Sequence, residues 1–140
     1  MNDQFELTLA NQRSEVARLQ DQLESFARQH GLAARGLHDL QLALEEHLAN
    51  ILAYGYDDTL AHQIRIRLRL QAAELRVEVE DDGHPFNPLE QPAPDLSKPI
   101  DERPIGGLGI HMMRKALDGM EYRRADGKNM LLMIKRVEAS

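Results

Sequence analysis

A strictly alternating pattern over two neighbouring segments constrains this fold more than any other feature of the chain. Residues 62–71 read HQIRIRLRLQ and residues 74–81 read ELRVEVED, so apolar side chains fall on one side and mostly charged side chains on the other. A period of two is typical of a half-buried β-strand. Because only a short QAA link joins the two segments, we predict an antiparallel hairpin. Its apolar face has to be covered by another part of the chain.

Two amphipathic helices precede the hairpin and can provide this cover. The segment SEVARLQDQLESFARQHG carries apolar residues at helical spacing, with Ser14 as a suitable N-cap and Gly31 after the end. A second pattern of this kind spans residues 33–54, where a leucine-rich stripe ends before Gly55. The sequence therefore predicts two consecutive helices.

Strand, loop and helix signals fill the rest of the chain. Residues 5–10 alternate weakly and predict a short first strand. Residues 87–106 contain five of the six prolines and predict a long loop. The segment GLGIHMMRKALDGM then resumes helical spacing, and MEYRR and NMLLMIKR are strand candidates joined by the turn ADGK.

The order of these elements is strand, two helices, two strands, loop, helix and two strands. Such an order without regular βαβ alternation is typical of an α+β fold. We therefore predict a two-layer α/β sandwich with the helices on one face of a mixed, mostly antiparallel sheet. A length of 140 residues is the usual size of one domain, so we expect residues 1–140 to form a single domain.

Composition limits the classes of partner. A formal net charge of -6 argues against direct nucleic-acid binding, which rests largely on clustered Lys and Arg. The absence of cysteine excludes disulfides, thiolate metal sites and a cysteine nucleophile. No apolar run reaches the roughly 18 residues of a membrane span, and the N-terminus lacks a signal sequence. We expect a cytoplasmic protein that binds a protein or a small molecule and no membrane.

Glu46 and Asn50 form the first candidate site. They lie four residues apart, so on a helix they share a face and can act on one ligand. That face lies opposite the leucine stripe, where solvated residues also belong, so periodicity alone leaves a plain surface open. The small residues on the same side, Ala43, Ala49 and Ala53, leave room for a ligand and favour a site.

The second candidate is the stretch VEVEDDGHPFNP, where a strand ends on Asp81, Asp82 and Gly83. An ordinary turn uses the same residues, because Asp bonds its own backbone and Gly accepts a positive φ.

The third candidate is GGLGI at residues 106–110, at the start of a predicted helix. Unpaired N–H groups and the positive helix end favour an anion there, although many such junctions use glycine only for turning. The six histidines show no short metal spacing, and we interpret each as a surface residue or a hydrogen-bonded core residue.

The three segments in this order resemble the GHKL ATPases, the Bergerat-fold family. That family combines a helix with Glu-x-x-x-Asn, a strand ending in Asp-x-Gly, and a lid closed by Gly-x-Gly at a helix start. The sequences DDGHPFNP, DERPIGGLGIHMMRKALDGMEYRR and GKNMLLMIKR are similar to those of the anti-sigma-factor serine kinases of bacterial partner-switching systems. This resemblance runs from about Ser14 to Arg136.

The resemblance implies ATP and Mg²⁺ as ligands and assigns a role to each candidate residue. It makes Glu46 the catalytic base and makes Asn50 a Mg²⁺ ligand through its amide oxygen. It makes Asp81 the acceptor for the adenine amino group, with Gly83 allowing the chain to approach the base, and it leaves Asp82 facing solvent or capping the turn. The residues that it places around the phosphates are Arg103, Gly107, Leu108 and Gly109.

The resemblance also implies the function. It implies an ATP-dependent serine/threonine kinase that phosphorylates a STAS-domain anti-anti-sigma factor and sequesters a sigma factor or equivalent regulator. It allows for a homodimer. An alternative from another class is a nucleotide-responsive partner-binding module without kinase activity. The proline-rich lid is short and no phospho-accepting His segment precedes the domain, which argues against a sensor histidine kinase.

Overall fold

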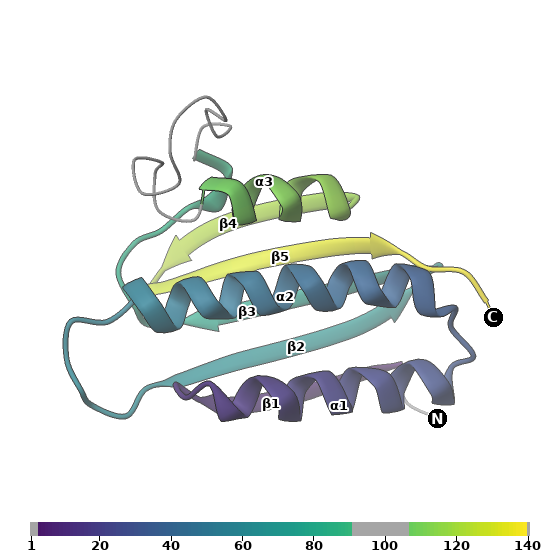
Figure 1. Cartoon of the computed structure of the whole chain (residues 1–140), viewed down its shortest axis with the longest axis horizontal. Coiled ribbons are helices and arrows are strands. Elements are labelled where there is room, and N and C mark those ends of the chain that lie inside the picture. Colours follow the sequence, from purple (N-terminus) through teal and green to yellow (C-terminus); the bar gives the residue numbers. More distant parts are fainter. Residues whose placement is uncertain (1–2, 91–106, 140) are drawn as a thin grey trace.

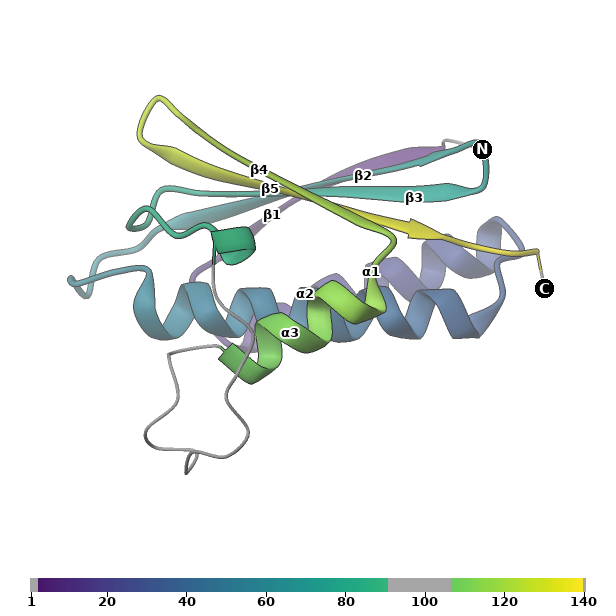
Figure 2. The same cartoon turned by 90° about the horizontal axis from the view of Figure 1, so that it is seen from above.

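The computed structural model describes residues 3–90 and 107–139 as an α/β sandwich of two layers (Figure 1). The sheet has five strands in the order β1-β2-β3-β5-β4, and every neighbouring pair is antiparallel. The strands are β1 Gln4–Ala10, β2 Gln63–Gln71, β3 Glu74–Asp81, β4 Gly119–Ala125 and β5 Lys128–Arg136. The α-helices are α1 Ser14–Gln29, α2 Ala34–Tyr54 and α3 Gly107–Ala116, and a short 3₁₀ helix η1 spans Pro88–Glu90. All three α-helices lie on one face of the sheet (Figure 2).

The predicted fold class is confirmed. The predicted hairpin is β2–β3, and its register places Leu68 opposite Val77 on the helix side and Arg67 opposite Glu78 on the open side. Its apolar side chains pack against α1 and α2, and the open face carries ion pairs such as that between Arg67 and Glu78. One detail of the prediction differs. The described strands form no parallel pair, so the sheet is antiparallel rather than mixed.

The helix boundaries agree with the sequence signals, although the physical reasons differ in part. Gly31 follows α1 with a φ of 64°, the left-handed conformation that favours glycine after a helix. The prediction of Ser14 as N-cap is wrong, because Arg13 already has helical dihedrals and occupies the N-cap without a side-chain hydrogen bond. Gly55 ends α2 as predicted, with its N–H donating to the carbonyl of Ile51 at 2.8 Å.

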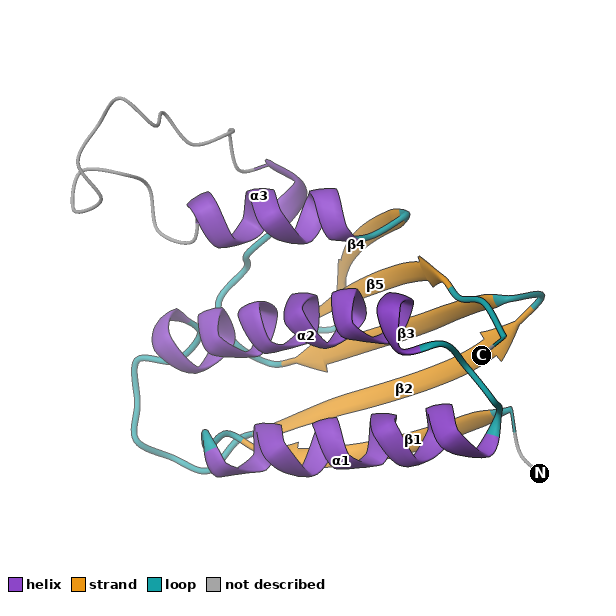
Figure 3. Cartoon of the chain, turned by 45° about the vertical axis from the view of Figure 1, so that its right-hand side comes forward, coloured by secondary structure: helices purple, strands orange, loops and turns teal. Residues whose placement is uncertain are grey.

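Three segments meet at one end of the molecule. The end of α2, the end of β3 and the start of α3 lie toward the same side in Figures 1 and 3. These segments carry the candidate residues Asn50, Asp81 and Gly109. Arg103 and most of the predicted proline-rich loop lie outside the described residues. No helix in the described part of the chain is long and apolar enough to span a membrane.

Candidate functional site

A small cavity opens where the last turns of α2 face the end of β3. Its volume is about 120 Å³. Residues of α2, of β3 and the segment after it, and of β5 line it, and they include His47, Asn50, Tyr54, Asp81, His84, Phe86 and Asn129. Two of the three predicted candidate segments, those of Asn50 and Asp81, therefore meet at one cavity.

Asp81 is the last residue of β3, and only 3% of it is exposed. Its Oδ1 accepts hydrogen bonds from the backbone N–H of Gly83 at 2.9 Å and from Nδ2 of Asn129 at 3.0 Å. Burial raises the pKa of the Asp81 carboxyl, and these two hydrogen bonds oppose that rise because they favour the charged form. Both donors bond Oδ1, and no described residue bonds Oδ2.

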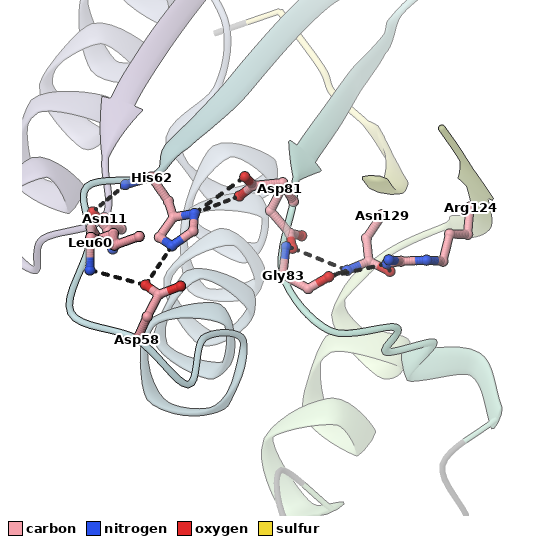
Figure 4. A network of polar contacts seen from close by, with 9 residues as sticks. Asn11, Asp58, Leu60, His62, Asp81, Gly83, Arg124 and Asn129 are labelled. Atoms are coloured by element: carbon pink, nitrogen blue, oxygen red, sulfur yellow. Dashed lines mark hydrogen bonds and ion pairs between the residues drawn. The ribbon is translucent and has the colours of Figure 1, made fainter. Parts of the chain in front are cut away.

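Asn129 holds this carboxylate in place, and the sequence did not identify it as a site residue. It is the direct cross-strand partner of Asp81 in the pairing of β3 with β5. Its Oδ1 accepts from Arg124 at 3.0 Å (Figure 4). Its Nδ2 also donates to the carbonyl of His84 at 2.7 Å, and its Oδ1 also accepts from the hydroxyl of Tyr122. The position and orientation of Asp81 are therefore fixed from two strands.

Gly83 allows the segment after β3 to pass close to the end of α2. A Cβ at this position would lie 2.7 Å from the carbonyl oxygen of Gly55, which is too close for a side chain. The next residue, His84, donates its backbone N–H to that same oxygen at 2.8 Å. Glycine is thus required by the packing of two backbone segments, a reason that the sequence analysis did not give.

Asn50 lies on the buried side of α2. It is 8% exposed, so the alternative of a solvated helix face does not hold for it. Its Nδ2 has no hydrogen-bond partner among the described residues. His47, one turn earlier, is 3% exposed, and neither of its ring nitrogens has a partner there either. The interpretation of every histidine as a surface or hydrogen-bonded residue is therefore wrong for His47.

Glu46 lies on another side of α2, where the helix faces α3. It lines a groove of about 320 Å³ together with small and sulfur-containing residues, among them Ala43, Ala49 and Met113. Gly109 of α3 contacts it closely, since a Cβ on Gly109 would overlap the Glu46 carboxylate. Glu46 and Asn50 therefore line two neighbouring hollows, where the sequence analysis expected one shared face.

The glycine segment begins α3, as predicted. Gly107 is the first helical residue, and Leu108 follows it, although the Leu108 side chain lies outside the described part of the chain. The helix has ten residues, and the N–H groups of its first turn and its dipole are suited to an anion. The described residues contain no group of three or more His, Asp or Glu side chains suited to a metal ion.

His62 holds the connection between α2 and β2 against the end of β3. Its Nε2 lies 2.7 Å from Oδ1 of Asp58 (Figure 4). Its Nδ1 lies 3.1 Å from Oδ1 of Asp82. Hydrogen bonds to these two carboxylates raise the pKa of His62. The ring stacks on Tyr56 with 4.0 Å between the centroids. Asp82 is exposed, as expected, and it also pairs with this histidine.

Curated proteins similar to this chain include two kinases of similar length. Serine/threonine-protein kinase BtrW of Bordetella bronchiseptica is 29% identical over 111 residues, which cover 79% of this chain and 78% of that protein. Serine-protein kinase RsbW of Bacillus thuringiensis is 25% identical over 134 residues, which cover 93% of this chain and 83% of that protein.

Solved structures also share the fold. A Mycobacterium tuberculosis protein with RsbU and RsbW domains matches 96% of this chain with a TM-score of 0.69 at 15% identity. A histidine kinase domain from a blue-light activated histidine kinase of Erythrobacter litoralis matches 88% with a TM-score of 0.57, also at 15% identity. The matched regions are 32% and 59% of those two chains.

The family model for the histidine kinase-like ATPase domain matches residues 9–135, which include α2, β3, α3 and thus both hollows described above. This chain belongs to the family of histidine kinase-like ATPase domains.

Proposed function

We propose that this chain is an ATP-dependent serine/threonine kinase of a partner-switching system. Its substrate would be a STAS-domain anti-anti-sigma factor, and it would also sequester a sigma factor or an equivalent regulator. Membership of a family of ATPase domains implies ATP binding. The relatives BtrW and RsbW are named as serine/threonine and serine kinases, which supports phosphoryl transfer to a hydroxyl group.

The observation that carries the proposal is the buried carboxylate of Asp81 beside the cavity. Its Oδ1 accepts hydrogen bonds from Gly83 and Asn129, and Oδ2 has no partner among the described residues. Oδ2 can therefore accept a hydrogen bond from the amino group of adenine. A hydrogen bond to a charged group in a site with little water is stronger than one between neutral groups. Guanine presents a carbonyl oxygen at the same position, and two acceptors would then face each other.

Asn50 suits the Mg²⁺ that accompanies ATP. Its amide oxygen is a hard ligand, and Mg²⁺ in nucleotide sites takes one or two protein ligands and completes its shell with phosphates and water. The lack of a carboxylate cluster among the described residues fits this sharing. When bound, the ion would neutralise the charge on the phosphates.

Glu46 and the start of α3 would serve the transferred phosphate. In the reaction the substrate hydroxyl oxygen forms a bond to the γ-phosphorus, the bond to the β–γ bridging oxygen breaks, and ADP leaves. Glu46 would accept the hydroxyl proton, and the N–H groups at Gly107–Gly109 would face the phosphate oxygens. The contact between Glu46 and Gly109 supports this placement because it joins the base and the phosphate segment.

The first test is titration of the purified chain with Mg²⁺-ATP and with Mg²⁺-GTP in a calorimeter, together with melting curves. ATP should give heat and raise the melting temperature by mass action, and GTP should bind much more weakly. Absence of both effects at millimolar ATP contradicts the assignment. Radiolabel transfer from ATP to a cognate STAS-domain protein then tests the kinase. Binding without transfer would favour the nucleotide-responsive partner-binding module instead.

A further inference from the structure

His47 is a buried polar residue that neither the fold nor the proposed chemistry explains. It lies on α2 among core leucines, it is 3% exposed, and neither ring nitrogen has a hydrogen-bond partner among the described residues. Buried polar groups in folded proteins are almost always hydrogen-bonded, because an unsatisfied group loses its hydrogen bonds to water and gains none in the protein. An unmet polar side chain on the wall of a cavity therefore indicates a ligand that completes its bonds.

The imidazole of His47 is neutral at physiological pH. Burial lowers its pKa to about 4, because the surroundings disfavour a charge. A neutral imidazole carries one N–H donor and one acceptor nitrogen. The ring can therefore offer one donor to a ligand in the cavity.

The other donors of this cavity are already engaged or lie elsewhere. Asn129 directs its Nδ2 to Asp81 at 3.0 Å and to the carbonyl of His84 at 2.7 Å. Arg124 donates to the carbonyl of Gly83 at 3.1 Å and to Asn129. Asn50 has a free Nδ2, but the proposed function assigns this side chain to the Mg²⁺ and phosphate end. Tyr54 and His84 also line the cavity, but both are exposed, and Nε2 of His84 lies 2.9 Å from Oδ2 of Asp57. Among the described residues, His47 is therefore the buried donor of the cavity wall that no partner or proposed role accounts for.

We propose that His47 is a base-recognition residue whose ring N–H donates to N1 of adenine. This inference rests on the proposed function and extends it. Adenine carries its amino donor and its N1 acceptor side by side on one edge. Asp81 and His47 line the same cavity and supply the matching acceptor and donor. Rejection of guanine would rest on Asp81, because the imidazole can change its tautomer and accept from the N1–H of guanine.

The decisive experiment combines a residue change with an atom change. Calorimetry would measure the affinity of the wild type and of His47→Leu for ATP and for 1-deaza-ATP, which has carbon in place of N1. We expect the wild type to bind ATP about five- to tenfold more tightly than 1-deaza-ATP, the usual effect of one net hydrogen bond. In His47→Leu this ratio should fall to about one. With 7-deaza-ATP, which keeps N1, His47→Leu should weaken binding as much as it does with ATP.

Protein stability separates a ligand contact from a structural role. Leucine has a similar volume and no polar atoms, so nucleotide-free His47→Leu should melt at or above the wild-type temperature. A lower melting temperature would mean that the ring has protein partners and would contradict the proposal. His47→Gln, which retains an N–H donor on a flexible side chain, should restore part of the preference for ATP.

Two failures can be told apart. If the wild type binds ATP and the ratio between ATP and 1-deaza-ATP is the same in His47→Leu, only the assignment of His47 is wrong. If the wild type binds no adenine nucleotide, the proposed function itself is wrong, and the inference is wrong with it.

Discussion

The cavity at the end of β3 and the groove between α2 and α3 are built in different ways. In the cavity, Asp81 and Asn129 are 3% and 5% exposed and are joined to each other and to neighbouring strands by hydrogen bonds. In the groove, Glu46 is half-buried beside Gly109 and has no hydrogen bond or ion pair with a described residue. Hydrogen bonds therefore hold the cavity side chains in place without a ligand, whereas only packing contacts position the Glu46 carboxylate.

We expect the cavity and the groove on the two sides of α2 to have different roles. A rigid cavity suits recognition of a flat base, because fixed hydrogen-bond partners lose little entropy on binding. A carboxylate with few restraints suits proton transfer, where its partners come with the nucleotide and the second substrate. Substitutions in the cavity should therefore change nucleotide affinity, and substitutions in the groove should change the rate of transfer. The predictions below test this separation.

The largest effect is expected for Glu46→Gln. Glutamine keeps the shape of the side chain but cannot accept the hydroxyl proton, so transfer should fall by roughly 10²–10⁴. ATP affinity should change by less than about tenfold, because the cavity at the end of β3 is unchanged. The measurement is radiolabel transfer to a cognate STAS-domain protein, with calorimetry in parallel.

Glu45→Gln is the matched control. Glu45 is exposed on the same helix and borders the same groove, so this variant makes the same change of charge without touching the proposed base. It should transfer phosphate at close to the wild-type rate. Undiminished transfer by Glu46→Gln would exclude Glu46 as the base.

Gly109→Ala should act on the same step through the position of Glu46. The new methyl group would overlap the carboxylate, so Glu46 has to move. Displacement of a reacting group by about 1 Å costs up to roughly 10²-fold in rate. Alanine favours the helix by about 1 kcal/mol over glycine, so α3 should not be weakened. Stopped-flow or radiolabel assays would measure the rate, and melting curves would confirm the fold.

A double variant tests whether the two positions act together. If Gly109→Ala works by moving Glu46, then adding it to Glu46→Gln should cause little further loss. Fully multiplicative losses would show instead that Gly109 contributes separately, for example to phosphate binding.

Asp81→Asn should reduce affinity for ATP and leave the fold nearly intact. The amide oxygen of asparagine can still accept from Gly83 and Asn129, but its amino group would face the amino group of adenine. We expect a loss of roughly 1–3 kcal/mol in binding free energy. Because burial raises the pKa of Asp81, the folded state disfavours its charged form, so the neutral asparagine should not lower stability at pH 7.

Asp82→Asn is the control for this change. Asp82 is exposed and pairs with His62, so its substitution alters a neighbouring carboxylate outside the cavity. Affinity for ATP should change much less than in Asp81→Asn. Equal losses in the two variants would mean that the general negative potential, and not a specific acceptor, governs binding.

The fold could be predicted largely from local patterns. The alternation in β2 and β3 defined both the hairpin and its buried face, because a strand has a period of two and its register follows from the apolar residues. The three helices followed from spacing and from Gly31 and Gly55. The capping role of Ser14 was wrong because a cap depends on where the backbone turns, and that turn precedes Arg13.

The site could be predicted only where a motif lies within one segment. Asp81 and Asn50 belong to recognisable local sequences, whereas Asn129 follows a turn, where asparagine is an ordinary residue. Only the pairing of β3 with β5 brings Asn129 opposite Asp81, and neither segment shows that pairing by itself. The packing of α3 against α2 could not be predicted from the sequence either. The spacing of Glu46 and Asn50 therefore indicated one shared open face of α2.

The smallest predicted effect concerns His62, which holds the connection between α2 and β2 against the end of β3, beside the cavity residue Asp81. Its imidazolium lies between Asp58 and Asp82, and these carboxylates raise its pKa above the ordinary 6.5. The pKa is higher in the folded state, so the contribution of His62 to stability is complete below about pH 6.5 and is lost as the pH rises through the raised pKa. Tyr56, which stacks on the ring, stays neutral over this pH range because burial raises its pKa.

The melting temperature should therefore fall slightly more between about pH 6 and pH 9 for the wild type than for His62→Gln. The difference should be at most about 3 °C, since His62 and its two carboxylate partners are solvent-accessible. ATP affinity of the wild type should decline over the same range while the rate of transfer from bound ATP does not. Identical pH profiles for the two proteins would show that Tyr56 and the backbone alone hold the connection between α2 and β2.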